Sequence, residues 1–256
     1  MKSKDIVIVG ILLGIGAIVR YVSLIAPGPI TSNLVIAFYS LAIILVAPKV
    51  SEALGIGIVA GIICALISHS LFPPANLISE PVGALVAVLS LKLIDQFTGA
   101  KKAIKVKADG GSMKKDNPLG FVITAIGLLG MLAFCGIMFL SEVKPLIKGT
   151  LLATQTNQII FGAIAVLVLL VGLYLIPRTL EKYRAAVVSL LATLASGTTF
   201  IVVAAIIIFA MPGILFKTAP AMDVFILSSM PIVIGCAIIN MVLAQILYFP
   251  AKQAMR

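Results

Sequence analysis

The sequence predicts an all-α membrane protein, a polytopic helical bundle of about eight transmembrane helices with both termini in the cytoplasm. The 256 residues are 61% hydrophobic and 11% charged, with a mean hydropathy of +1.23, whereas soluble domains usually carry about 25% charged residues. The hydrophobic residues also fall into separate runs, several of them close to the roughly 20 residues that a spanning helix needs. The connections between the runs divide their Lys and Arg residues unequally, as membrane orientation requires.

The first run, from Ile6 to Pro27, is about as long as the hydrocarbon core is thick. Its inner half carries small residues at Gly10, Gly14 and Ala17, spaced so that they share one helix face and let another helix approach closely. Its outer half carries Arg20. The run therefore predicts a spanning helix with a packing face near one membrane surface and a cation near the other.

Turn and charge signals separate the later runs, with Pro48-Lys49 closing the second and Pro73-Pro74 closing the third. A polar segment at 97–118, containing six lysines, divides the chain. We expect one membrane domain over 1–256, composed of four spans in 1–96, a basic loop at 97–118 and four spans in 119–256. The predicted spans are residues 6–27, 33–47, 54–71, 82–96, 119–141, 157–176, 186–211 and 223–249.

The charges of the connections predict the orientation. With the N-terminus inside, the outer side receives only Lys144, Lys148 and Lys217. The inner side receives the six lysines of the loop and also Lys2, Lys4, Lys49, Lys92, Arg178, Lys182, Arg184, Lys252 and Arg256. By the positive-inside rule, the loop and both termini are cytoplasmic. The same distribution explains the net charge of +10 without a nucleic-acid partner.

No pattern in the sequence indicates an enzyme. Paired carboxylates, a Ser/His/Asp set and a phosphate-binding G-x-x-x-x-G-K-[ST] loop are not visible. Cys64, Cys135 and Cys236 all fall in apolar runs, which predicts small buried side chains and no disulfide or metal cluster. We therefore expect no catalytic residues, metal or cofactor.

Polar residues at membrane depth are candidates for a binding site, because a polar or charged group in hydrocarbon is costly unless it faces a cavity or partner. The candidates gather in the outer half and predict a pocket open to the exterior. They are Arg20, Asn33, Tyr39, His69, Asn76, Glu80, Ser228 and Ser229. In this prediction Asn76 and Glu80 belong to the connector between the third and fourth spans.

Structural roles are open for several polar residues. For Arg20, the alternatives to substrate binding are contact with the outer lipid headgroups or a structural pair with Glu80. For His69, the alternative is a position at the membrane interface without a role in binding. Hydroxyls in the seventh span, at Ser196, Thr198 and Thr199, are expected to bond back to their own helix. Asn240 and Gln245 are expected to bridge helices near the cytoplasmic side.

Two stretches resemble the S components of energy-coupling factor (ECF) transporters, the substrate-binding membrane subunits of these ABC importers. They are GILLGIGA at 10–17 and SSMPIVIGCAIINMVLAQILYFPAK at 228–252, together with the Pro48-Lys49 turn. The family usually carries an Ala-x-x-x-Ala pair where this chain has Gly10 and Gly14. It also usually has six spans, so the pair at 119–176 would be an insertion.

The resemblance implies a subunit that captures a small nutrient, such as a vitamin, cofactor precursor or amino-acid-like compound, in a prokaryotic plasma membrane. Its partners would be a coupling membrane subunit, docked on Gly10, Gly14 and Ala17, and two ATPase subunits that hydrolyse ATP. Ordinary packing inside the bundle is the alternative for that face. A secondary transporter of two four-span halves, or a membrane assembly protein, is the alternative function. Arg20 and His69 favour a carboxylated substrate.

Overall fold

The computed structural model describes residues 1–24, 31–98, 115–139, 143–210 and 222–254, and these form helices with no strand among them. Most of the predicted basic loop at 97–118, and Lys217, lie outside the described residues. By its internal contacts the chain separates into two compact units. Unit 1 combines residues 1–93 with 183–256, and unit 2 comprises residues 94–182.

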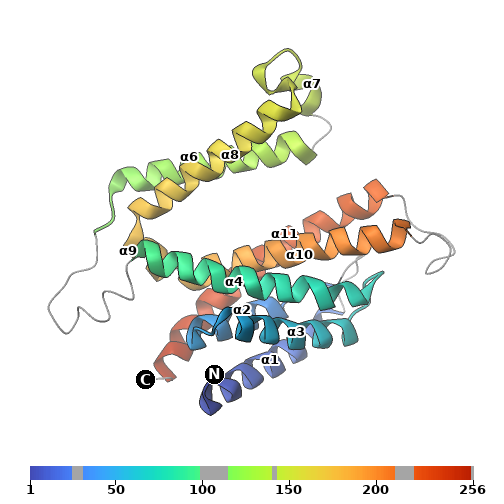
Figure 1. Cartoon of the computed structure of the whole chain (residues 1–256), viewed down its shortest axis with the longest axis vertical. Helices are drawn as coiled ribbons and strands as arrows, with labels where there is room; N and C mark the ends of the chain where they lie inside the picture. The colour runs from blue at the N-terminus through green and yellow to red at the C-terminus, as the bar shows by residue number, and fades with distance from the viewer. Residues whose placement is uncertain (25–30, 99–114, 140–142, 211–221, 255–256) are drawn as a thin grey trace. The chain divides into compact units, whose positions relative to one another are not determined.

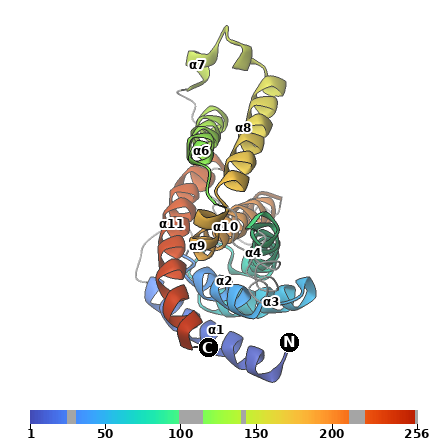
Figure 2. The same cartoon turned by 90° about the vertical axis from the view of Figure 1, so that its left-hand side faces the viewer.

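The main helices of unit 1 correspond to six of the predicted runs. They are α1 (Ser3–Ser23), α2 (Val35–Val46), α3 (Val50–Leu66), α4 (Asn76–Thr98, whose last turn belongs to unit 2), α10 (Arg184–Ala210) and α11 (Met222–Ala254), with a short 3-10 turn, η1 (Pro73–Ala75), before α4. The central helix is α2, which contacts α1, α3, α10 and α11. Figure 2 shows it between α1 and α10. Its residues from Val35 to Ile44 are all buried, as expected for a helix that is apolar on every side.

Prolines set two of the helix boundaries in this unit. Helix α2 ends at Val46, because Ala47 adopts a left-handed conformation (φ 49°) and is followed by Pro48, which has no N–H for a continuing helix. Helix α4 begins after Pro73-Pro74 and continues through Pro81. The fourth helix therefore starts about six residues earlier than the predicted span at 82–96, and Asn76 and Glu80 lie on a helix and not in a connector.

Close backbone contact between α3 and α4 accompanies this internal proline. A Cβ atom at Gly57 would lie 2.6 Å from the Cα of Pro81, and one at Gly61 would lie 2.7 Å from the carbonyl oxygen of Asn76. Glycine is therefore needed at both positions for α3 to lie against the first turns of α4. This contact fixes the part of α4 that carries Asn76 and Glu80.

Unit 2 is a helical hairpin. Its long helices, α6 (Pro118–Phe139) and α8 (Gln155–Leu175), lie side by side in Figure 1. Short elements lie between and after them: α7 (Lys144–Ile147), the 3-10 turn η3 (Leu151–Ala153) and α9 (Pro177–Lys182). The Asp116 carboxylate caps α9 by accepting hydrogen bonds from the backbone N–H groups of Arg178 (2.7 Å) and Thr179 (3.1 Å).

Four helices in the described residues are long and apolar enough to cross a bilayer: Ser3–Ser23, Pro73–Thr98, Arg184–Ala210 and Val224–Ala254. Four further apolar helices are shorter and coincide with the other predicted runs. The chain is accordingly an all-α membrane protein, as the sequence predicts. The count of eight spans and the cytoplasmic position of both termini stay predictions.

Candidate functional site

Glu80 is the central residue of a polar site inside unit 1. It lies in the second turn of α4, and only 1% of its surface is exposed. Its Oε1 atom accepts hydrogen bonds from Asn33 Nδ2 at 2.6 Å, Ser196 Oγ at 2.9 Å and Ser79 Oγ at 3.4 Å. Its Oε2 atom makes no hydrogen bond of standard geometry among the described residues, but the Tyr39 hydroxyl of α2 lies close enough to the carboxylate to interact with it. One carboxylate thus joins α4 to α10, to α2 and to the chain just before α2.

Asn33 connects this carboxylate to two further helices. Its side-chain oxygen accepts from the Cys64 thiol of α3 at 3.5 Å, and its backbone carbonyl accepts from Asn240 Nδ2 of α11 at 2.8 Å. Asn240 also donates to Thr193 Oγ1 on α10 at 3.1 Å. Because the Asn33 amide oxygen faces a thiol, its NH2 group is directed toward Glu80. Helices α3, α4, α10 and α11 are therefore all hydrogen-bonded, directly or through one residue, to the chain entering α2.

A cavity of about 30 Å³ borders Glu80, with room for about two water molecules. Three of the predicted site residues line it: Asn33, Asn76 and Glu80. The rest of the described lining combines hydroxyl groups, a thiol and apolar side chains: Thr31, Ser32, Ile36, Thr193, Ser196, Gly197, Phe200, Ile232, Val233 and Cys236. The cavity lies where α4, α10 and α11 meet the start of α2.

Arg20 is buried, with 1% of its surface exposed, but it is not among the residues that line the cavity. Its Nε donates to the carbonyl of Ile67 at 2.8 Å and one terminal nitrogen donates to the carbonyl of Cys64 at 3.2 Å. Both carbonyls belong to the C-terminal end of α3, where a cation is favourable to the helix dipole. No direct ion pair joins Arg20 to Glu80, although both residues are described, but the charge of Arg20 acts on Glu80 at longer range. The Arg20 guanidinium therefore caps α3 and partly offsets the charge of Glu80 without contacting it.

The remaining candidates are not among the residues that line the cavity. Tyr39 is fully buried on α2, and its hydroxyl lies beside Glu80 and Ser196. His69 is exposed after α3, where its backbone N–H donates to Thr31 Oγ1 at 2.9 Å. On α11, Ser228 is exposed and bonds back to the carbonyl of Val224, whereas Ser229 is buried without a partner in the described chain. None of the four is in the cavity lining, so their part in substrate binding stays a prediction.

Ser196 and Thr193 line the cavity, but neither was among the binding residues that we predicted from the sequence. Ser196 was expected to bond back to its own helix but donates to Glu80 instead; this prediction was wrong, because a nearby buried carboxylate is a stronger acceptor than a backbone carbonyl. Thr198, two residues on, does bond back to Leu194 and Ala195 as predicted. The sequence around Thr193 does not indicate a binding site, because its place in the cavity depends on α4 and α11 packing beside α10.

The predicted bridging residues of α11 are confirmed. Asn240 joins α11 to α10 and to Asn33, and the Gln245 side-chain oxygen accepts from the backbone N–H of Ala186 at 3.1 Å. Asn240 was expected to lie too far toward the cytoplasm to meet an outer pocket. It nevertheless contacts the backbone of a cavity residue, because α2 enters the bundle between α10 and α11.

The predicted docking face on α1 is open in the structure. Gly10 and Gly14 are exposed, and a Cβ atom at either position would meet nothing within 4 Å. Ala17 is half-buried. The glycine that packs inside the bundle is instead Gly16, whose Cβ would lie 3.2 Å from the Cβ of Phe38 on α2. Internal packing therefore does not account for Gly10 and Gly14.

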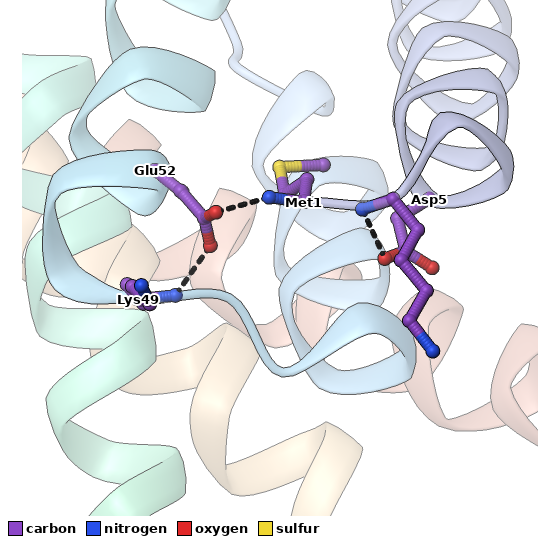
Figure 3. A network of polar contacts seen from close by, with 5 residues as sticks. Met1, Asp5, Lys49 and Glu52 are labelled. Carbon is purple, nitrogen blue, oxygen red and sulfur yellow. Dashed lines mark hydrogen bonds and ion pairs between the residues drawn. The ribbon is translucent and has the colours of Figure 1, made fainter.

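A polar network at the other end of α1 joins the beginnings of two helices (Figure 3). The N-terminal ammonium of Met1 donates to and pairs with Glu52, and Glu52 also accepts from the backbone N–H of Lys49 at 2.7 Å. Asp5 accepts from the backbone N–H of Lys2 at 2.9 Å. Helices α1 and α3 therefore begin at the same end of unit 1, as expected when one span separates them.

The described residues contain no group of three or more His, Cys, Asp or Glu side chains that could hold a metal ion. Cys64 and Cys236 are free and buried, whereas the side chain of Cys135 is outside the described part of the chain. The chain matches no protein-family model, no curated protein and no solved structure.

Proposed function

We propose that the chain is the substrate-capture subunit of an ECF-type importer in a prokaryotic plasma membrane, and that the cavity at Glu80 receives part of a small nutrient. The observation that carries this proposal is a buried carboxylate beside a cavity inside a helical unit of an apolar chain. Ionisable groups are costly among membrane helices and are characteristic of substrate and ion pathways. The surrounding hydroxyl and amide groups supply the few directed polar contacts of a small-molecule site.

The division of the chain supports the resemblance to S components. Six of the main helices lie wholly or mostly in unit 1, which contains the cavity, and six is the usual number of spans in that family. The helical pair beyond six, α6 and α8, falls in a separate compact unit that interrupts unit 1 in the sequence. A transporter of two four-span halves gains no such support, because unit 1 joins the first 93 residues to the last 74.

The open face of α1 supports a partner in the membrane. Gly10 and Gly14 have free space above them, and the neighbouring Ile6, Ile11, Ile15 and Ile18 are exposed. A helix with such a glycine pair permits close approach by another helix, whereas lipid contact alone does not require glycine. A coupling subunit docked here would leave the cavity untouched, because none of its lining residues is on α1.

Isolation of a tagged chain from the cells that make it tests the proposal. We expect a coupling membrane subunit and two ATPase subunits, identified by their own phosphate-binding loops, to co-purify in stoichiometric amounts. Replacing Gly10 and Gly14 with Leu should release all three while leaving the chain folded. Gly55→Leu is the matched control, since Gly55 is an equally open glycine on α3. Purification of the chain without ATPases, or an unchanged complex in the double variant, would contradict the proposal.

A further inference from the structure

The charged groups around the cavity balance one another. Glu80 is the only acidic residue among the described lining residues, which include no lysine, arginine or histidine. Its carboxylate accepts hydrogen bonds from Asn33 and Ser196 and interacts with the Tyr39 hydroxyl. The charge of Arg20 acts on the same carboxylate at longer range. The site thus contains one negative and one positive charge, and these offset each other within the protein.

This balance leaves no countercharge for an ionic ligand. An ion that enters the membrane interior loses its hydration, which is costly unless an opposite charge compensates for it. Glu80 already has its donors and the field of Arg20. Arg20 in turn is held by the carbonyls of Cys64 and Ile67 and does not line the cavity, so it is not placed to meet an anion there. A group that binds in the cavity is therefore expected to be uncharged.

Asn76 is the lining residue with hydrogen-bonding capacity to spare. Only 3% of its surface is exposed, and its Nδ2 donates to the carbonyl of Pro73 at 2.7 Å. Its Oδ1 has no partner in the described chain, and this atom is not enclosed by protein. Because the side chain is otherwise buried and lines the cavity, the open space at this oxygen is the cavity. The amide therefore offers one acceptor and the second hydrogen of its NH2 group.

The rest of the lining is already paired or apolar. Thr193 Oγ1 donates to the carbonyl of Ser189 and accepts from Asn240, and Ser196 Oγ donates to Glu80. The apolar lining consists of Ile36, Phe200, Ile232 and Val233, with Gly197 between the polar residues. Apolar walls with a few directed polar groups are typical of a site for a neutral small molecule.

We propose that the cavity binds an uncharged carboxamide group against Asn76, and hence that the captured nutrient carries a neutral amide at this end. A carboxamide has a donor and an acceptor side by side, which complement the acceptor and donor that Asn76 keeps. The inference rests on the capture function proposed above and replaces the carboxylated substrate that the sequence favoured. The volume of about 30 Å³ accommodates a group about the size of two waters, so the rest of the nutrient lies beyond the cavity.

Thermal unfolding of the purified chain in detergent tests this assignment with three probes of the same planar shape: formamide, formate and formamidinium. They differ in charge, being neutral, negative and positive. A ligand of three heavy atoms reaches at best an affinity on the order of millimolar. At about 100 mM, formamide should therefore raise the Tm by about 3 °C over the probe-free buffer. Sodium formate and formamidinium chloride should give no increase over sodium chloride at the same concentration.

A substitution of equal shape locates the effect. Asn76→Asp adds a negative charge to the cavity, so it should at least halve the formamide shift and create a shift with formamidinium. Asn117→Asp is the matched control, because Asn117 lies outside the cavity lining and its Oδ1 accepts from the backbone N–H of Leu119 at 3.0 Å, as an aspartate can. This control should keep the formamide shift and gain none with formamidinium. If Asn76→Asp does not fold, the comparison of the three probes on the unaltered chain still decides.

A shift with formate or formamidinium that equals or exceeds the shift with formamide would overturn the assignment, because the cavity would then hold an uncompensated charge. No shift with any of the three probes, or a full formamide shift in Asn76→Asp, would overturn it as well. None of these results bears on co-purification with ATPase subunits. The carboxamide assignment and the capture function can therefore fail separately.

Discussion

Units 1 and 2 both bring helices together at glycines, but unit 1 adds a buried polar network to this packing. In unit 2, α6 and α8 meet through small residues: a Cβ atom at Gly127 would lie 2.6 Å from the backbone of Leu169, and one at Gly172 would lie 2.5 Å from Thr124. In unit 1, hydrogen bonds from Asn33, Ser196 and Asn240 link five segments around Glu80. Glycine contacts close a helix pair without leaving space, whereas a polar cluster leaves both space and unpaired atoms.

This difference indicates where function resides. Backbone-to-backbone packing needs no buried charge and creates no site that could bind a polar molecule. A buried carboxylate is costly among membrane helices, and such groups mark functional sites in membranes. Unit 1 therefore carries the candidate site, and unit 2 is expected to be dispensable for ligand binding.

The largest expected effect is on the labelling of introduced cysteines, which tests the orientation of the chain in the membrane. Each cysteine is expected either to react in intact cells or not to react. A cysteine at Ser112, in the predicted cytoplasmic loop, should not react with an impermeant thiol reagent in intact cells and should react after lysis. A cysteine at the exposed Lys148, predicted to be outside, should react in both. Efficient labelling at Ser112 in intact cells would reverse the orientation that the lysine distribution predicts.

Overpacking a glycine contact in each unit tests their independence. Gly57→Leu should lower the free energy of unfolding by about 3 kcal/mol or more, because the new side chain would meet Pro81 and Ala84 of α4, and it should prevent co-purification with the ATPase subunits. Gly172→Leu should disrupt the α6–α8 pair by a similar amount and leave co-purification intact. Thermal unfolding and affinity isolation measure the two effects. Loss of the ATPase subunits in Gly172→Leu would show that the assembly depends on unit 2.

Substitution of Arg20 separates capping from ligand binding. Arg20→Ala removes two donors from the C-terminal carbonyls of α3, so it should lower the free energy of unfolding by about 1–3 kcal/mol. Arg20→Lys should recover part of this loss, since an ammonium keeps the charge but cannot reproduce two separately directed N–H groups. A carboxylated ligand held by Arg20 would instead lose at least tenfold in affinity in Arg20→Ala.

The smallest effect comes from the network at the start of α3. Hydrogen bonds from the Met1 ammonium and the Lys49 backbone lower the pKa of the partly exposed Glu52, which precedes the predicted span at 54–71. Because the folded-state pKa is the lower one, this contact stabilises the fold above the usual carboxyl pKa and is lost as the pH falls through the lowered value. Glu52→Gln should flatten this acid-side dependence of the Tm slightly. An unchanged profile in Glu52→Gln would show that the contact adds no stability.

The sequence by itself determined that this is a helical membrane protein, because hydropathy and helix length are properties of contiguous residues. It also determined that Asn240 and Gln245 bridge helices and that Thr198 bonds to its own helix, since a polar side chain in hydrocarbon has few other partners. The eight apolar runs reappear as helices, although Pro81 led to a late start for the fourth. Proline normally ends a helix, and only the structure shows that this one lies inside α4, where Gly57 of α3 packs against it.

The tertiary structure alone decided which polar residues share a site. Asn33, Glu80 and Ser196 are far apart in the sequence and meet only because α2 lies between α10 and α11 while α4 packs on α3 and α10. It also decided that Arg20 faces the end of α3 and that Gly10 and Gly14 face outward while Gly16 packs on Phe38. A run that is apolar on every side carries no periodic signal for its inward face, so the rotation of each helix is fixed by packing against its neighbours and not by its own residues.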